Sequence, residues 1–493
     1  MRSLEALLLA GLLLGAGCSS IHRQPEMDHG GALVAAARGM ARVVDLTQTL
    51  DGEATVYSPE LGWRFEVQPH EDSVVPLIKT GEHTGTHMDS ALHFLVAGAD
   101  MADSRPGDLL RPAVVLDLRE ETRENPNLPV DVARLERWER EHGKIPVGSI
   151  VVLLTGREES GFASSHDHPG FTLEAATFLR TERDIAGVGT DALSPDIGNS
   201  LAYPVHQRLL QDECMIVENL RHLGRLPPIG AHLVMGPLPV DDATGAPARV
   251  LGLLGEDDAV VYRFMDLTHV LGRGTPYLEG RDPLFPRPER SGTALAPVRR
   301  SGSFQPARLL YYGGVFSVGQ QTGTHLTFPA LSVQGEVDAA RFPAGDLLAP
   351  LVVLDLTDLD PGTALDPVEL RRRLGGATER GAVVLLRTRR WYSVGGGRRT
   401  RGYPGLSPDA AETLMSAGAR GVISQAAAID PSGVDGRPAE RVVHQHGGFG
   451  GGFMNLPRRR TLPGSGASIA LLSLPIAGAG AAPARVVAVF PEP

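Results

Sequence analysis

The feature of the sequence that most constrains the fold is an internal repeat. Residues 83–118 align without a gap with residues 321–356, and sixteen of the 36 aligned pairs are identical. The identities fall in several separated blocks, such as Thr84–His87 with Thr322–His325, so neither chance nor low complexity explains them. We infer a duplication and predict two tandem domains of one architecture, which suits a chain of 493 residues.

The boundaries of the two units follow from the place where the opening of the first is repeated. Val43–Thr47 is restated by Phe264–Thr268, and a charged linker at Gly255–Asp258 separates the two units. We therefore predict domains at residues 41–255 and 256–493.

Each unit alternates apolar runs with amphipathic stretches, which is the pattern of an α/β fold. Ile150–Leu154 and Ala382–Leu386 are predicted to be buried strands. Helices are predicted directly after Thr172 and Ser407, because each of these hydroxyl residues can cap the N-terminus of an amphipathic stretch.

The composition is that of an acidic globular protein. Hydrophobic residues make up 42% of the chain, enough to bury a core, and the formal net charge is -11. An excess of carboxylates repels phosphate backbones, so nucleic acid is excluded as the main partner.

Residues 1–18 have the organisation of an export signal. An apolar run over residues 6–17 is too short to span a bilayer but suits the hydrophobic region of a signal peptide. It ends at Cys18 in a sequence similar to a bacterial lipoprotein box. We therefore expect an exported, periplasmic or cell-envelope lipoprotein of a bacterium, held on the membrane by a lipidated Cys18 and a tether over residues 19–40. Ordinary secretion and a disordered leader on a cytoplasmic protein are the alternatives.

The second cysteine, Cys214, lies in an apolar, strand-like run. With Cys18 lipidated it has no cysteine partner in the chain, so no internal disulfide is expected. We predict a small buried hydrophobic residue and not a nucleophile.

Four titratable residues stand at odd positions within eleven residues: His83, His87, Asp89 and His93. In an extended segment of period two they project to one face, whereas a helix would separate them. Imidazole nitrogens with a carboxylate oxygen suit Zn²⁺, Mn²⁺ or Fe²⁺, of which we expect Zn²⁺ or Mn²⁺. A metal site is the favoured interpretation, and a structural polar cluster is the alternative.

Two residues more than a hundred positions later extend the candidate site. Glu218 follows an apolar run that predicts a strand, where an unpaired carboxylate would be unfavourable to bury. His206 lies twelve residues before Glu218. A metal ion would neutralise the carboxylate. The alternative is a solvated Glu218 at a strand end and a His206 that caps a helix.

The stretch His83–His93 resembles the signature H-x-G-T-H-x-D-x-P-x-H of the cyclase superfamily of metal-dependent hydrolases, which includes bacterial kynurenine formamidases and isatin hydrolases. The sequence departs from this pattern at Ala91, where proline is usual. Asp45–Thr47, Val188–Asp191 and Glu218–Leu220 also resemble family blocks, in the order of the family.

The resemblance implies a role for each matched residue. Five residues would hold metal, with Asp89 shared between a first position (His83, His87, Asp89) and a second (Asp89, His206, Glu218). His93 would donate and accept protons instead of binding metal. The resemblance also implies a swivelling β/β/α fold in each unit and a dimeric assembly. In this chain the two units would form that assembly as an intrachain pseudo-dimer, and a higher oligomer is open.

The implied activity is hydrolysis of a C–N bond in a small amide, an aryl formamide or a cyclic amide. A bound divalent ion lowers the pKa of its water and polarises the substrate carbonyl, and His93 can move the proton to the leaving nitrogen. Ester or lactone hydrolysis by the same centre is one alternative. A non-catalytic metal- or ligand-binding lipoprotein is the other.

The repeat alignment predicts that the second unit has lost its site. Gln321, Thr327 and Leu331 stand where the first unit has His83, Asp89 and His93, and Met454 aligns with Glu218. By this alignment His87 and His206 persist as His325 and His444. Two imidazoles without a carboxylate make a poor hydrolytic centre, so we expect the second unit to serve as the partner of the pseudo-dimer.

Overall fold

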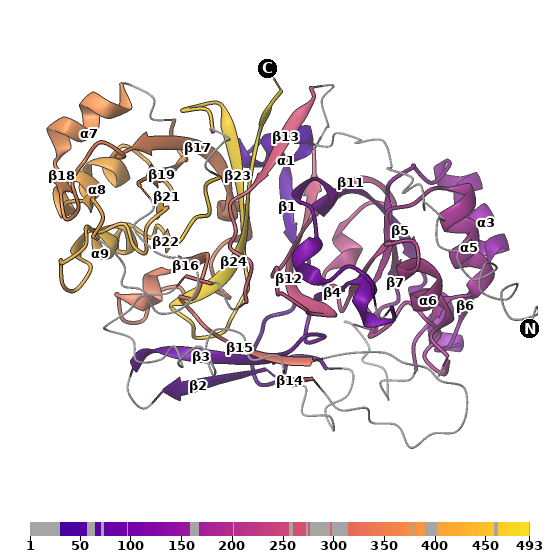
Figure 1. The fold of residues 1–493 in the computed structure, drawn as a ribbon. Coiled ribbons are helices and arrows are strands. Elements are labelled where there is room, and N and C mark those ends of the chain that lie inside the picture. The colour runs from indigo at the N-terminus through magenta and orange to yellow at the C-terminus, as the bar shows by residue number, and fades with distance from the viewer. Residues whose placement is uncertain are drawn as a thin grey trace, which may run out of the picture.

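The computed structural model describes residues 30–492 except for 57–64, 71–72, 96, 158–166, 201, 256–259, 273–274, 277–295, 298–313, 376–378, 390–401 and 458–461. Two units of like architecture stand side by side, and a smaller sheet runs beneath both (Figure 1). In each unit a mixed sheet faces the centre of the molecule and helices lie towards the outer end (Figure 1). The predicted α/β class is therefore confirmed.

The first unit is built on an eight-stranded mixed sheet. Its strands are β1 (Arg42–Asp45), β4 (His87–Asp89), β5 (Leu110–Asp117), β7 (Ile150–Leu154), β9 (Gly187–Thr190), β10 (Met215–Glu218), β11 (Ile229–Pro237) and β12 (Gly245–Leu254). They are ordered β1-β12-β11-β5-β7-β9-β10-β4, and the neighbours from β5 to β10 are parallel. Because β4 pairs with both β10 and β12, the sheet closes on itself.

The sheet of the second unit repeats this topology. Its strands are β13 (Tyr262–Asp266), β16 (His325–Thr327), β17 (Leu348–Asp355), β19 (Val383–Arg387), β21 (Gly421–Ser424), β22 (Gly450–Gly452), β23 (Ala467–Ser473) and β24 (Ala481–Pro491). β17, β19 and β21 are parallel neighbours, like β5, β7 and β9. β16 pairs with β22 and β24 just as β4 pairs with β10 and β12.

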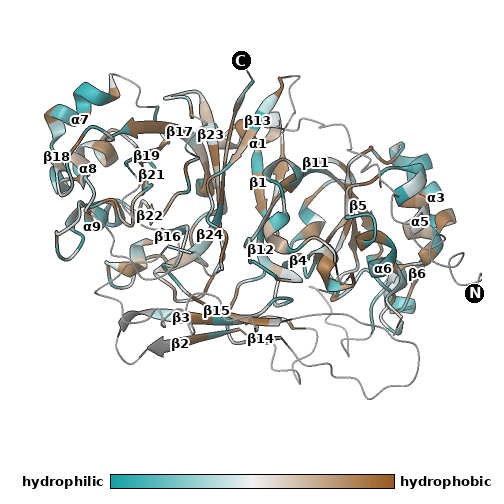
Figure 2. Ribbon diagram, in the orientation of Figure 1, coloured by the Kyte–Doolittle hydropathy of each residue, from teal (hydrophilic) through white to brown (hydrophobic). Residues whose placement is uncertain are grey.

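The helices cover the outer face of each sheet. They are α2 (Arg119–Glu124), α3 (Val132–His142), α5 (Leu173–Glu182) and α6 (Pro204–Leu210) in the first unit, and α7 (Pro367–Leu374), α8 (Pro408–Ser416) and α9 (Pro438–Gln445) in the second. Thr172 and Ser407 cap α5 and α8 as predicted, since their side chains accept the N–H groups of Ala175 and Ala410. Helices α3 and α7 are largely hydrophilic, whereas the central strands are largely hydrophobic (Figure 2).

Two short parallel strand pairs accompany the helices, one in each unit. They are β6 (Pro129–Val130) with β8 (Gly170–Phe171), and β18 (Ala364–Leu365) with β20 (Gly405–Leu406). Gly170 lies so close to the backbone of Asp196 that an added Cβ would stand 2.2 Å from the Asp196 carbonyl carbon. The segment after β9 is therefore packed tightly against β8.

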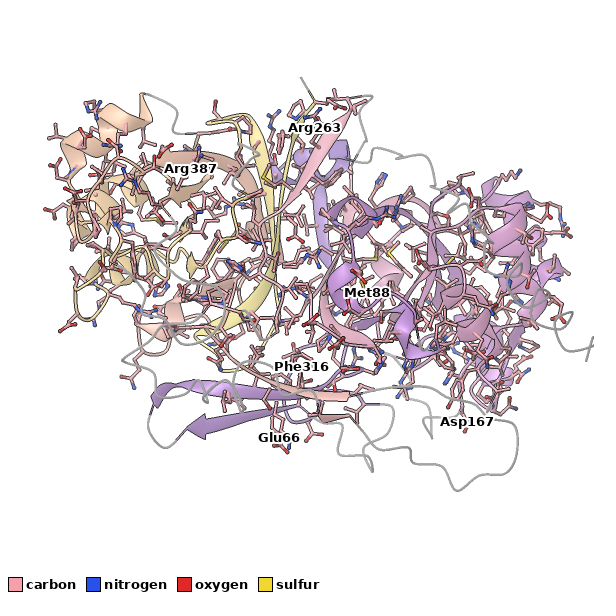
Figure 3. The ribbon with its side chains drawn as sticks, in the orientation of Figure 1. Glu66, Met88, Asp167, Arg263, Phe316 and Arg387 are labelled. Carbon is pink, nitrogen blue, oxygen red and sulfur yellow. The ribbon has the colours of Figure 1, made fainter. Side chains whose placement is uncertain are left out.

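The smaller sheet joins the two units through backbone hydrogen bonds. Its strands are β2 (Glu66–His70), β3 (Ser73–Gly81), β14 (Ala296–Pro297) and β15 (Gly314–Gly319), in the order β14-β15-β3-β2. The central pair crosses between the units, with Gly81 opposite Val315 and Thr80 opposite Phe316. Phe316 is fully buried and lies in this sheet between the two units (Figure 3). Strand β3 leads directly into His83, so the second unit supports the approach to the candidate site.

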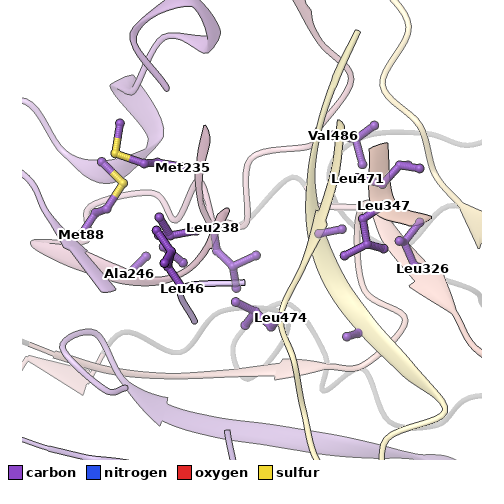
Figure 4. Packing of buried hydrophobic residues seen from close by; sticks show 14 of the residues in the cluster. Leu46, Met88, Met235, Leu238, Ala246, Leu326, Leu347, Leu471, Leu474 and Val486 are labelled. Carbon is purple, nitrogen blue, oxygen red and sulfur yellow. The ribbon is translucent and has the colours of Figure 1, made fainter. Parts of the chain in front are cut away.

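One hydrophobic cluster extends across both units. It includes Leu46 and Leu238 of the first unit and Leu471 and Leu474 of the second. In Figure 4 Leu474 lies between the two units, whereas Leu471 lies on the far side of the second unit's sheet, beside Leu347. A cluster shared in this way buries apolar surface that neither unit could bury alone.

Two fully buried arginines reinforce the boundary symmetrically. Arg249 pairs with Asp45 at 2.6 Å within the first unit and donates to the Ser473 carbonyl of the second at 3.2 Å. Arg485 pairs with Asp266 at 2.6 Å in the second unit and donates to Ser104 of the first. Because removing either partner would leave a buried charge unpaired, these contacts hold the units in one relative position.

The prediction of a tether over residues 19–40 is wrong for part of this range. Residues 30–37 form helix α1 (Gly30–Ala37), in which every residue except Ala35 is buried. The helix packs against β12 of the first unit and against β17, β23 and β24 of the second. Its run of small residues allows this close packing: a Cβ added at Gly30 would stand 2.5 Å from Tyr262. The predicted signal peptide and Cys18 lie outside the described residues, and none of the helices described is long and apolar enough to cross a membrane.

Candidate metal centre

The first four candidate residues converge, but not on one extended segment. Only His87–Asp89 is a strand, β4. His83 lies in the turn between β3 and β4, and His93 ends the short 3₁₀ helix η2 (Ala91–His93). The turn requires a left-handed backbone at Gly85, with φ of 61°, and a Cβ there would stand 2.7 Å from Leu50 Cδ2. The prediction of a continuous extended stretch was therefore wrong, although the side chains still meet.

Glu218 and His206 reach the same place from neighbouring elements. Glu218 ends β10 directly opposite His87 of β4, so both side chains project from the same face of the sheet. His206 lies on α6, whose first N–H groups are held by the buried carboxylate of Asp196. Glu218 and His206 are more than a hundred residues from His93 in the sequence. The pairing of β10 with β4 and the position of α6 bring them to the same place.

The ligand atoms lie within contact distance of one another. His83 Nδ1 is 2.8 Å from Asp89 Oδ1, and His87 Nε2 is 3.1 Å from Glu218 Oε2 and 3.5 Å from Asp89 Oδ1. His206 Nε2 is 3.2 Å from both Asp89 Oδ2 and Glu218 Oε1. All five side chains are buried. Asp89 contacts three imidazoles and is the shared centre of the cluster.

In His83, His87 and His206 the ring nitrogen that points away from the cluster has a hydrogen-bond partner. His87 Nδ1 is 2.9 Å from the Gly85 carbonyl, and His206 Nδ1 is 2.6 Å from Asp196 Oδ2. His83 Nε2 is 3.0 Å from Thr244 Oγ1, whose hydroxyl donates to Glu82. Such contacts fix the proton on the outward nitrogen and leave the inward nitrogen as a ligand.

The cluster fits a divalent metal ion on two counts. Three of its buried atoms, His87 Nε2, Asp89 Oδ2 and Glu218 Oε1, have no hydrogen-bond partner of acceptable geometry among the described residues. Nitrogen and oxygen ligands at about 2.1 Å from one ion lie about 3.0–3.4 Å apart, close to the spacing found here. Imidazole and carboxylate are also the ligand types that Zn²⁺ and Mn²⁺ accept.

Electrostatics favour positive charge at this place. Burial lowers the pKa of His87, but pairing with Glu218 and the nearby Asp89 outweigh burial and raise it. For His206 burial is likewise outweighed, by Asp196, Asp89 and Glu218, and its pKa is raised well above the usual value. Burial raises the pKa of Asp89, yet His83 and His206 hold it well below its usual range. A divalent cation would supply the positive charge that protons otherwise provide.

His93 is placed at the edge of the cluster. Its ring lies 4.1 Å from the ring of His83 and 5.9 Å from that of His206, measured between centroids. One of its nitrogens lies within 4.8 Å of ligand atoms of His83 and Asp89. The position suits a group that reaches the reacting atoms beside the metal ligands.

Several supporting residues were missed in the sequence. Asp196, Thr244 and Glu82 carry no local signal, because their partners are distant in the chain or contacted through a loop. Gly245 lies opposite Asp89 on β12, and a Cβ there would stand 2.6 Å from His83 Cε1, so the glycine makes room for the imidazole. Cys214 is buried away from these groups, and burial raises the pKa of its thiol to about 12, as expected of an unreactive cysteine.

The strand pairing and helix contacts of the second unit correct two counterparts that the repeat alignment had assigned, those of Glu218 and His206. Gly452 of β22 lies opposite His325, where β10 places Glu218 opposite His87, so Gly452 and not Met454 is the counterpart of Glu218. Asp430 accepts the N–H groups of Ala439 and Glu440 on α9, as Asp196 does for Val205 and His206 on α6. The counterpart of His206 is therefore Glu440, and His444 lies one helical turn further on.

An ion pair fills the centre of the second site. Arg437 Nη1 is 3.2 Å from Glu440 Oε2, and Arg437 Nη2 donates a hydrogen bond to Gln321 Oε1 at 2.9 Å. Thr327, at the place of Asp89, donates to Glu440 at 2.7 Å. Burial lowers the pKa of His325 to about 4, so this imidazole is neutral. The second site thus carries its own cation and lacks the paired carboxylates of the first.

The chain is similar in sequence to known proteins over both units. A family model described as "Putative cyclase" matches residues 44–197 and 265–431, one stretch in each unit. The chain is 31% identical over 192 residues to isatin hydrolase of Roseibium aggregatum, covering 35% of this chain and 72% of that protein. It is 26% identical over 215 residues to kynurenine formamidase of Bacillus anthracis, covering 42% and 95%. The solved isatin hydrolase A from Labrenzia aggregata bound to benzyl benzoate is 31% identical, covers 45% of this chain and 98% of that one, and has a TM-score of 0.42.

Proposed function

The chain belongs to the cyclase family, and from this premise we propose that its first unit is a metal-dependent hydrolase that cleaves the C–N bond of a small amide. The substrate class is an aryl formamide or a cyclic amide. Its relatives are named for isatin, a cyclic amide, and for the formamide of kynurenine, which supports this class.

The observation that carries the proposal is the buried cluster around Asp89. His83, His87, Asp89, His206 and Glu218 would hold the metal, which we expect to be Zn²⁺ or Mn²⁺. A divalent cation held there lowers the pKa of a bound water and polarises a carbonyl group. The residues of the chain supply the rest: they exclude solvent, fix the ligand tautomers and place His93 beside the reacting atoms.

His93 is proposed as the proton carrier. An imidazole can accept a proton from water and return it to the leaving nitrogen at neutral pH. Its ring lies 4.1 Å from that of His83, close enough to serve a substrate held at the cluster.

We propose one active site per chain and an intrachain pseudo-dimer of two swivelling β/β/α domains. Four of the five ligands are replaced in the second unit, by Gln321, Thr327, Glu440 and Gly452, and Arg437 occupies its centre. The strand pairing of β3 with β15 supports a role for that unit as the partner of the first. We also propose that the chain is an exported lipoprotein anchored through Cys18, an expectation that rests on the sequence alone.

The test is hydrolysis of formanilide and isatin by the metal-reconstituted protein, with His93→Ala beside wild type. We expect turnover by wild type, about one set of metal ions per chain, and a loss in kcat of about 10²–10⁴-fold in His93→Ala with metal content retained. Unchanged kcat in the variant would remove His93 from the mechanism. Absence of hydrolysis by wild type would refute the proposed substrate class, and metal bound at two equivalent sets per chain would refute the single site.

A further inference from the structure

Asn219 is a buried amide whose Nδ2 donor has no hydrogen-bond partner in the part of the chain that the structure describes. It follows the ligand Glu218 directly and is 4% exposed. A buried donor without an acceptor destabilises the folded state, so one that persists beside the candidate metal ligands indicates that a ligand accepts from it.

The backbone at this position does not explain the amide. Asn219 has a left-handed φ of 55°, and asparagine tolerates this conformation well. Its N–H donates to the Ala192 carbonyl, and its carbonyl accepts from Thr86 Oγ1. In the second unit Phe453 makes the same two contacts, with Ala426 and Thr324, at φ of 56°. A residue without an amide therefore holds the same backbone, so the side chain is free to serve another purpose.

The second unit also shows which way the side chain at this position points. The Phe453 ring lies 6.0 Å from the ring of His325, which is the counterpart of His87. Phe453 also packs with Tyr403, Ala426 and Ala427. By this equivalence the Asn219 side chain leaves β10 beside His87 and enters the space around the metal ligands. The decayed site has an apolar ring where the complete site has a hydrogen-bond donor.

We propose that Asn219 is a further catalytic residue of the first unit: its Nδ2 donates a hydrogen bond to the substrate carbonyl oxygen as that oxygen gains negative charge. This inference rests on the proposed function. In the hydrolysis a C–O bond forms from water to the acyl carbon, the C–N bond breaks, and the proton passes to the leaving nitrogen. Between these events the former carbonyl oxygen carries a charge that a fixed amide donor stabilises more than it stabilises the neutral substrate.

The test compares Asn219→Gly and Asn219→Asp with wild type on formanilide and isatin. Glycine accepts the left-handed backbone without strain, and aspartate keeps the shape and the tolerance of that backbone but replaces the donor by a negative acceptor. We expect kcat to fall about 10²–10³-fold in Asn219→Gly and further in Asn219→Asp, with KM changed less than about threefold. Metal content, measured by elemental analysis, and Tm serve as structural controls and should stay near the wild-type values.

The order of the two variants separates a donor from a structural role. A structural asparagine would be replaced well by its isostere, so Asn219→Asp would then match wild type in kcat. That result, or a kcat within threefold of wild type in Asn219→Gly, would overturn the inference while leaving the proposed function intact. If wild type hydrolyses neither substrate, the proposed function fails, and the donor assignment to an amide carbonyl fails with it.

Discussion

The ion pair between Arg437 and Glu440 is expected to stabilise the second unit in a way that depends on pH. Glu440 is 3% exposed at its side chain, while Arg437 is 30% exposed. Breaking a fully buried pair costs about 3–5 kcal/mol. Because Arg437 is partly solvated, we expect Arg437→Met to lower the free energy of unfolding by a smaller amount, about 2 kcal/mol at pH 7.5. For a unit of this size that corresponds to a fall in Tm of about 4–8 °C.

The pH dependence follows from the carboxyl group. In wild type burial would raise the pKa of Glu440, but Arg437, His444 and Thr327 outweigh burial and lower it. The contribution of Glu440 is therefore present above the unfolded pKa near ~4.5 and is lost as pH falls through the lowered value. Without Arg437 burial dominates and the pKa rises, so Glu440 then destabilises the fold increasingly as pH rises above ~4.5. The gap in Tm between wild type and Arg437→Met should widen from pH 4.5 to pH 7.5.

Calorimetry from pH 4.5 to pH 7.5 measures this gap, with the double variant Arg437→Met/Glu440→Gln as the matched control. The double variant should recover most of the lost Tm, because an amide at position 440 can still accept from Thr327 and carries no charge. Turnover and metal content should not change in either variant at 25 °C. A deficit in Tm that is independent of pH, or that the second substitution fails to relieve, would refute the assignment of Glu440 as a charged buried partner.

Two further predictions concern single groups. Asp196→Asn should lower the metal affinity of the first unit about 10–100-fold, because a neutral amide holds the proton on His206 Nδ1 less strongly than a carboxylate does. A chelator competition that returns the wild-type affinity would contradict this role. His325, whose pKa burial lowers to about 4, should stay neutral from pH 7 down to about pH 4.5 in ¹⁵N NMR spectra. Its contribution to stability is present above the unfolded pKa near ~6.5 and is lost as pH falls towards 4, and a titration midpoint near 6.5 would show that the imidazole is not desolvated.

The sequence was sufficient for the features that depend on local pattern. The repeat predicted two units of like topology, and apolar runs and N-caps located β7, β19, α5 and α8. The candidate ligands were found because histidines and carboxylates at close spacing are unusual outside functional sites. Their convergence in the structure requires that β4 and β10 pair, which puts Glu218 opposite His87, and that α6 brings His206 to the same place.

Features that depend on contacts distant in the chain were not predictable. The sequence alignment paired Glu218 with Met454, and thereby Asn219 with Asn455, whereas backbone contacts match Asn219 with Phe453. A shift of a few residues within loops leaves no local trace, so the true counterparts Glu440 and Gly452 were missed. Helix α1 was missed for a different reason: a short run of alanine and glycine has little amphipathic signal, and its packing between the units stabilises it.

The cross-pairing of β3 with β15 sets an order of events during synthesis. Gly81 lies opposite Val315, so β3, which pairs locally with β2, finds its second partner β15 only after more than two hundred further residues have been made. Pairings of such long range form late, because the loop must close before its contacts contribute. A truncated or incompletely translated chain would therefore contain every metal ligand and still lack the strand that supports the first of them. Completion of the sheet beside the candidate site is thereby deferred until β15 of the second unit has been synthesised.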